Sequence, residues 1–167
     1  AYGPRIIEMV HARNRRVFLD LKFHDIPNTV ALAVRQAVRL GVMMLTVHAS
    51  GGSQMIKAAV EAAGDEAQKR GVERPLIVGV TVLTSQEASG DTVLALAGSG
   101  IDAGLDGVVA SVREAVILRE GIKKEFVIVT PGIRAAGAKS DDQKRVATVA
   151  DAVRAGSTFL VVGRPII

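Results

Sequence analysis

The chain has 167 residues and a formal net charge of +4, and its length predicts a single domain over residues 1–167. Hydrophobic residues make up 49% of the chain but aromatic residues only 3%, and no cysteine is present, which excludes disulfides, thiolate metal sites and a cysteine nucleophile. No apolar run approaches the roughly 20 residues of a membrane helix, and no basic stripe is interleaved with aromatic residues. We therefore expect a cytoplasmic protein with an aliphatic core that binds neither membranes nor nucleic acid.

Short β-rich runs alternate along the chain with segments of helical hydrophobic spacing. In the first such helix Val30, Val34 and Val38 share one face, Pro27 suits its first position and Gly41 suits the position after its end. We expect strands at residues 16–21, 43–47, 76–83, 106–110, 126–129 and 158–162. We expect helices at residues 27–40, 54–70, 112–120 and 146–155.

Steady alternation of strands and helices indicates either a doubly wound sheet or a barrel, and the pattern alone does not separate the two. A complete (β/α)8 barrel needs about 200 residues or more, so a barrel requires pieces that this sequence does not contain. Residues 86–104 include Gly90, Gly98, Gly100 and Gly104, and we expect a short, weak helix there. We also hypothesise a gap near residues 101–104.

The most informative stretch is VFLDLKFHDIPNT, residues 17–29. Alternate side chains of a strand share a face, so Phe18, Asp20 and Lys22 would point together into a barrel. The other face would contact covering helices through Val17, Leu19 and Leu21. Burying an acid and a base costs free energy unless the two charges pair with each other. Active sites of βα proteins lie at the carboxyl ends of their strands. The alternative interpretation is a salt bridge that closes the barrel mouth, or Asp25 acting as a helix cap.

Two later strand ends carry sequences suited to a phosphate. They are TPGIR at residues 130–134 and VGRPI at residues 162–166, and the last two βα loops of barrels often bind phosphate. Gly163 lets the backbone approach a phosphate closely, and Arg164 offers a planar fork of donors. Each motif is also common in ordinary turns, but together they favour a small anionic substrate.

LDLKFHDIPNT resembles the signature of the orotidine 5′-monophosphate decarboxylase family. TPGIR and GRPI resemble the ends of that family's seventh and eighth strands, while TVLTS at residues 81–85 and VHAS at residues 47–50 resemble the ends of its fifth and fourth. The resemblance covers residues 1–167 and implies an α/β fold, a (β/α)8 TIM barrel with six of its eight strands visible here. It also implies a homodimer that needs no cofactor and no metal, and that converts orotidine 5′-monophosphate (OMP) to UMP and CO2 in pyrimidine biosynthesis.

The same resemblance implies roles for individual residues. Lys22 would donate a proton to C6 of the pyrimidine, with Asp20 beside the substrate carboxylate. Asp25 would reach into the partner subunit's site, with Ile26 and Thr29 alongside it. The remaining substrate-binding residues would contact the pyrimidine or the phosphate: Thr84, Ser85, Arg134, Gln143, Gly163 and Arg164. His48 would play a supporting, hydrogen-bonded role.

Parts of the family pattern have no counterpart in this sequence. Absent are the first two strands, most of the helix after the fifth strand, and the last helix. The first two strands would supply a second lysine and a ribose-binding aspartate. We therefore expect the sequence to be incomplete. One alternative is a metal-dependent phosphosugar decarboxylase or aldolase of the same superfamily, and another is a non-catalytic phosphate-binding module. The runs DIPNT and TPGIR favour the OMP decarboxylase.

Overall fold

The computed structural model describes residues 3–82, 89–134, 147–163 and 166. The strands are β1 (Phe18–Phe23), β2 (Met44–His48), β3 (Leu76–Val80), β4 (Gly107–Val109), β5 (Val127–Thr130) and β6 (Phe159–Leu160). The helices are α1 (Arg5–His11), α2 (Pro27–Arg39), α3 (Gly52–Arg70), α4 (Gly90–Asp102), α5 (Val112–Gly121) and α6 (Val149–Arg154), with a 3-10 turn η1 at Ala49–Gly51. None of these helices is long and apolar enough to span a membrane.

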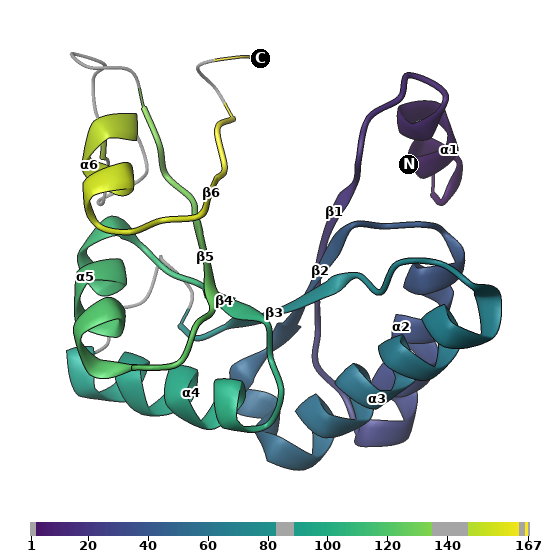
Figure 1. Ribbon diagram of the computed structural model, residues 1–167, viewed down its shortest axis with the longest axis horizontal. Coiled ribbons are helices and arrows are strands. Elements are labelled where there is room, and N and C mark those ends of the chain that lie inside the picture. Colours follow the sequence, from purple (N-terminus) through teal and green to yellow (C-terminus); the bar gives the residue numbers. More distant parts are fainter. Residues whose placement is uncertain (1–2, 83–88, 135–146, 164–165, 167) are drawn as a thin grey trace.

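The sheet decides between the two folds that the alternating pattern left open. Within the described residues, six strands pair in parallel in the order β1-β2-β3-β4-β5-β6. A doubly wound sheet reverses its strand order at a switch point, whereas a barrel wall adds each strand beside the previous one. Figure 1 shows the sheet curled, with α2 to α6 along its convex side. The prediction of an α/β fold of the barrel type is confirmed.

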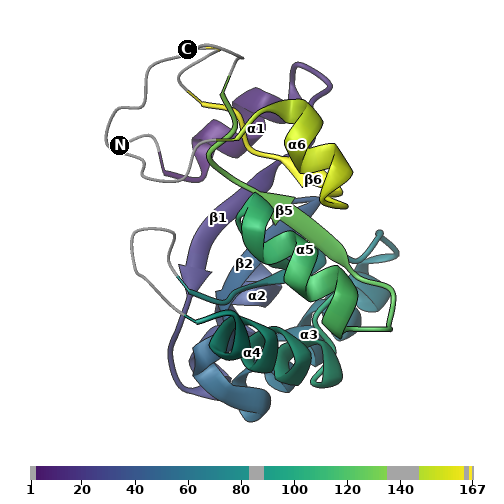
Figure 2. The ribbon, with the colours of Figure 1, turned by 90° about the vertical axis from the view of Figure 1, so that its left-hand side faces the viewer.

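Apolar side chains fill both faces of this sheet, as its parallel strands require. On the concave face Met44, Val78 and Val129 form one cluster. On the convex face Leu45 and Ile77 belong to a cluster that packs β2 and β3 against α2 and α3. A second convex cluster packs β4 and β5 against α4 and α5, which lie side by side in Figure 2. The two neighbouring residues Met44 and Leu45 thus face opposite ways, as strand geometry dictates.

Two helices differ from the sequence-based expectation. The short, weak helix expected within residues 86–104 was wrong, because α4 runs for 13 residues. Its stripe of Val93, Ala97 and Ile101 is buried, and the Ser89 hydroxyl accepts the Thr92 N–H at 3.2 Å as an N-terminal cap. The chain then turns at Gly104, where φ is +107°, and enters β4. Helix α1 was not predicted at all.

Candidate functional site

A cavity of about 140 Å³ lies where the strands of the sheet end. Parallel strands end at the same edge, which is the edge that carries the active site in barrels of this type. Strands β1, β3, β4 and β5 and the segments that follow β3, β5 and β6 line the cavity: Phe18, Asp20, Lys22, Val80, Val82, Val109, Val129, Pro131 and Val161. The wall is therefore apolar except for one acid and one base from β1.

Asp20 and Lys22 form an ion pair in this cavity, with Lys22 Nζ 2.6 Å from Asp20 Oδ2. Together with Phe18 they line the same space, which confirms the prediction that these three side chains share the inner face. The side chains of Lys22 and Asp20 are 36% and 47% exposed. An ion pair with this exposure contributes only about 0–1 kcal/mol to stability. The pair is thus accessible to a ligand and is of little use as a structural salt bridge.

The backbone that carries the pair departs from a regular strand. Leu19 pairs with Leu45 and Phe23 with Val47, so four steps along β1 span two steps along β2. Lys22 adopts a left-handed conformation with φ of +52°, which raises the energy of a non-glycine residue by about 1–2 kcal/mol. Such irregularities occur next to active sites, where they re-aim side chains.

Leu21 shows the consequence of this irregularity. We expected Leu21 to contact the covering helices, but the prediction was wrong, because its side chain is 59% exposed. Val17, Leu19 and Phe23 do pack against the convex cluster. The extra residues of β1 break the strict alternation between Leu19 and Phe23 and leave Leu21 outside the core.

Thr46 of β2 completes the arrangement, and sequence reasoning missed it. Its side chain is fully buried. Thr46 Oγ1 accepts the Lys22 backbone N–H at 2.9 Å and donates to Asp20 Oδ1, also at 2.9 Å. The available signal was a hydroxyl in the apolar run MLTVH, two residues after inward-facing Met44 and close to the strand end.

Two histidines border the ion pair. The rings of His24, which follows β1, and His48, which ends β2, lie 4.9 Å apart with planes inclined by 31°. Burial of its ring lowers the pKa of His48, and the charges of His24 and Lys22 lower it further. His24 is exposed to solvent apart from this ring contact. The supporting role expected for His48 stays a prediction.

Asp25, Ile26 and Thr29 lie at the start of α2 and are exposed, with Ile26 at 67%. Asp25 Oδ1 accepts the N–H of Ile26, the residue that precedes the helix, at 2.7 Å. None of the three lines the cavity described above. The roles expected for Asp25, Ile26 and Thr29 therefore stay predictions.

One of the two segments expected to bind phosphate, TPGIR at residues 130–134, lies at the end of β5. Gly132 has a φ of +80°, which glycine adopts without strain. Ile133 then forms a parallel bridge with Ala147, and the Arg134 N–H donates to the Ala147 carbonyl oxygen at 3.0 Å. The backbone on either side of residues 135–146 is thus joined.

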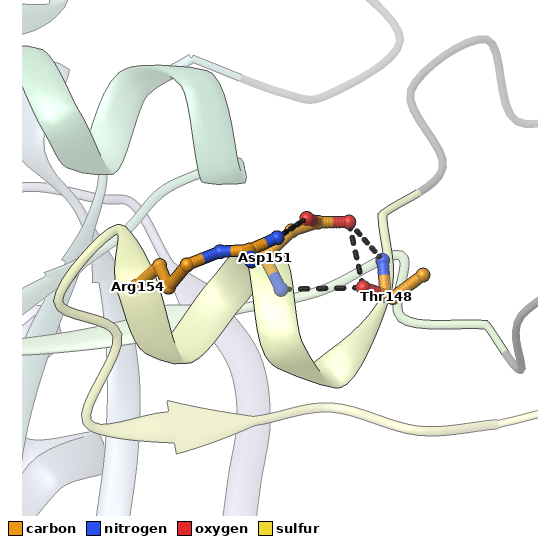
Figure 3. A network of polar contacts seen from close by, with 3 residues as sticks. All are labelled: Thr148, Asp151 and Arg154. Atoms are coloured by element: carbon orange, nitrogen blue, oxygen red, sulfur yellow. Dashed lines mark hydrogen bonds and ion pairs between the residues drawn. The ribbon is translucent and has the colours of Figure 1, made fainter.

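Helix α6 begins directly after this bridge and is capped at its first turn. Thr148 Oγ1 accepts the Asp151 N–H at 3.2 Å, and Asp151 Oδ2 accepts the Thr148 N–H at 3.1 Å (Figure 3). The same carboxylate accepts the Thr148 hydroxyl at 2.6 Å and pairs with Arg154 at 2.6 Å. These bonds, those from Thr148 first, lower the pKa of Asp151 to about 2. The carboxylate is therefore ionised throughout the neutral range.

Of the remaining expected phosphate residues, Gly163 follows β6 and is exposed. A side chain at Gly163 would meet no atom within 4 Å, so packing within the described chain does not demand a glycine there. Thr84, Ser85, Gln143 and Arg164 lie outside the described residues. Among the described residues, no group of three or more His, Asp or Glu side chains is arranged to hold a metal ion.

Comparison with known proteins places the chain among decarboxylases. Residues 1–167 match the model of the family described as "Orotidine 5'-phosphate decarboxylase / HUMPS family". An orotidine 5′-phosphate decarboxylase of Vibrio cholerae is 49% identical over 176 residues, covering 99% of this chain and 74% of the relative. One of Syntrophus aciditrophicus is 50% identical over 177 residues, covering 99% and 70%. The crystal structure of a Lactobacillus acidophilus orotidine 5′-phosphate decarboxylase superposes with a TM-score of 0.83 at 38% identity, covering 98% of this chain and 73% of that one.

Proposed function

Because the chain belongs to the orotidine 5′-phosphate decarboxylase / HUMPS family, we propose that it is a carboxy-lyase that converts OMP to UMP and CO2. The observation that carries the proposal is the Lys22 ammonium, held 2.6 Å from Asp20 in a cavity whose other lining residues are apolar. The relatives named above carry the same activity in their names. The reaction belongs to pyrimidine biosynthesis, and we propose that it takes place in the cytoplasm.

The chemistry of the reaction explains why an ammonium is needed in an apolar cavity. Loss of CO2 from C6 leaves a carbanion in the plane of the pyrimidine ring, where the π system cannot delocalise it. A fixed positive charge beside C6 stabilises this carbanion as it forms, most strongly where water is excluded. Lys22 then transfers a proton to C6, and the ion pair with Asp20 holds the ammonium in place before the reaction. No metal or organic cofactor takes part in this scheme.

Other residues hold the substrate in our proposal. Asp20 also lies beside the carboxylate that leaves as CO2. The pyrimidine and the phosphate are bound by the residues that the family resemblance assigns to them: Thr84, Ser85, Arg134, Gln143, Gly163 and Arg164. The join between Ile133 and Ala147 supports this assignment, because it anchors the chain where a phosphate-binding segment would begin and end.

The active protein is a homodimer in this proposal, with residues 1–167 as part of a single domain. Asp25, Ile26 and Thr29 complete the partner subunit's site. Their exposure supports this role, since Ile26 leaves 67% of its surface uncovered beside an exposed carboxylate. An exposed aliphatic side chain flanked by polar groups is typical of a protein contact.

The test follows the ultraviolet absorbance of OMP in the presence of EDTA. The proposal predicts conversion to UMP that EDTA does not slow. Activity that needs Mg²⁺ and acts on a phosphosugar instead would identify the metal-dependent reaction of the same superfamily. Binding of OMP by the intact, folded dimer without turnover would identify a phosphate-binding module.

A further inference from the structure

We propose that Thr46 is a positioning residue of the reaction, an inference that rests on the proposed function. Its buried hydroxyl joins the Lys22 backbone to the Asp20 carboxylate, so that the Lys22 ammonium occupies one place in the cavity. Thr46 is not among the residues that line the cavity. It therefore acts through Asp20 and Lys22 and not on the substrate.

The hydrogen-bond directions follow from the chemistry of the three groups. A backbone N–H only donates and an ionised carboxylate only accepts, so Thr46 Oγ1 accepts from Lys22 N and gives its own proton to Asp20 Oδ1. Asp20 Oδ2 remains for the Lys22 ammonium, at 2.6 Å. The three residues thus close a ring of contacts in which each carboxylate oxygen has a separate partner.

Thr46 lies opposite the irregular part of β1. Its neighbours Leu45 and Val47 pair with Leu19 and Phe23, so Thr46 faces the residues that lack regular ladder partners. Lys22 has a left-handed φ of +52°, and its N–H donates to the Thr46 hydroxyl in place of a backbone carbonyl oxygen. The hydroxyl therefore holds a backbone conformation that a regular strand would not supply.

A threonine suits this task better than a flexible polar residue. Its branched side chain has few rotamers, and full burial between β1 and β3 restricts it further. Groups fixed before the substrate arrives need not reorganise as charge develops in the transition state. Loss of the Thr46 hydroxyl should therefore lower kcat more than it weakens substrate binding.

The experiment compares Thr46→Val, which keeps the shape and removes the hydroxyl, with Thr46→Ser, which keeps the hydroxyl. We expect Thr46→Val to lower kcat by about 10- to 100-fold with KM within about threefold of wild type. Thr46→Ser should recover kcat to within about threefold. The matched control is Thr158→Val, because the Thr158 hydroxyl likewise accepts a backbone N–H from a neighbouring strand, that of Ile128 at 3.1 Å, but away from the ion pair. Its kcat should stay within about twofold of wild type.

A second measurement tests the geometry without relying on turnover. Amide hydrogen exchange at Lys22 should be at least about tenfold faster in Thr46→Val than in wild type, because the N–H loses its buried acceptor. A folded Thr46→Val enzyme with kcat within twofold of wild type overturns the proposal, as does an equal loss in Thr158→Val. If Thr46→Val does not fold, Thr46→Ala takes its place under the same criteria. If the wild-type protein does not decarboxylate OMP, the proposed function fails. The positioning role is then judged by the rate of amide hydrogen exchange at Lys22, and an unchanged rate in Thr46→Val overturns it as well.

Discussion

The Lys22 side chain combines a partner at 2.6 Å with substantial exposure, and its backbone is held in a left-handed conformation. The ion pair adds little to stability at this exposure, whereas the proposed chemistry depends on the ammonium. We therefore expect Lys22→Ala to reduce kcat for OMP by more than about a thousandfold. The free energy of unfolding should change by less than about 1 kcal/mol.

Lys57→Ala serves as the control for Lys22→Ala, because Lys57 is an exposed lysine on α3 that does not line the cavity. Its activity should equal that of wild type. The absorbance assay and chemical denaturation measure the two quantities. A folded Lys22→Ala protein that keeps a tenth of wild-type turnover would contradict the assignment of Lys22 as proton donor.

Asp151 makes stability depend on pH. Its pKa falls from the ordinary value of 3.8 to about 2 in the folded protein, chiefly through the bonds from Thr148. A carboxylate with a depressed pKa stabilises the fold fully above its unfolded pKa, and this stabilisation is lost as the pH falls toward the folded pKa. Asp151→Asn should therefore be less stable than wild type at pH 6, and the difference should shrink between about pH 4 and pH 2.

Denaturant titrations of wild type and Asp151→Asn at several pH values measure this difference. Thr148→Val, which removes one donor to the carboxylate, should show the same trend with a smaller amplitude. A difference between wild type and Asp151→Asn that stays constant down to pH 2 would contradict the role given to the Asp151 charge.

At the scale of elements, two glycines illustrate how packing decides the effect of one methyl group. Gly107 of β4 lies against β5, and an alanine side chain there would overlap the Val127 carbonyl oxygen. Gly98 lies inside α4, and an added methyl group would meet no atom within 4 Å. The same substitution should thus destabilise the strand pair and stabilise the helix.

We expect Gly107→Ala to lower the free energy of unfolding by about 1–3 kcal/mol, because backbone atoms must move to make room. Gly98→Ala should raise it by about 0.5–1 kcal/mol, because alanine restricts the unfolded chain and favours helix. Thermal and denaturant unfolding of both variants measure whether each substitution lowers or raises the free energy of unfolding. Stabilisation by Gly107→Ala would mean that β4 and β5 are less closely paired than described.

At the scale of the whole molecule, the proposed dimer divides each active site between two chains. Lys22 would come from one subunit and Asp25 from the other. A mixed dimer of Lys22→Ala and Asp25→Ala subunits then contains one site with both substitutions and one with neither. Mixing the two inactive proteins in equal amounts, with subunit exchange, should restore about a quarter of wild-type activity, because half of the dimers are mixed and each has one intact site.

The control is the same mixture kept at a temperature too low for subunits to exchange, or a mixture of dimers cross-linked beforehand. Either control should stay inactive. Absence of any recovery, with mixed dimers demonstrated by native mass spectrometry, would place Asp25 in the site of its own subunit. Sedimentation of the wild-type protein as a monomer would contradict the dimer itself.

The sequence by itself determined much of the local structure. The alternation of strands and helices, and the inward direction of Phe18, Asp20 and Lys22, follow from hydrophobic periodicity and turn residues, which act over a few neighbouring positions. The sequence also predicted that this acid–base pair lies at a strand end, because Pro27 marks the start of the next helix shortly after β1.

Only the tertiary structure decided the features that depend on contacts between distant parts of the chain. The consecutive strand order separated a barrel wall from a doubly wound sheet. Burial of Val93 and Ala97 against the sheet made α4 a full helix despite its glycines. Thr46 joined Lys22 and Asp20 across 24 and 26 positions of sequence, opposite the irregular part of β1 where Leu21 is exposed. Local pattern does not encode which strand lies beside which, and strand pairing is what brings a buried hydroxyl to a charged pair.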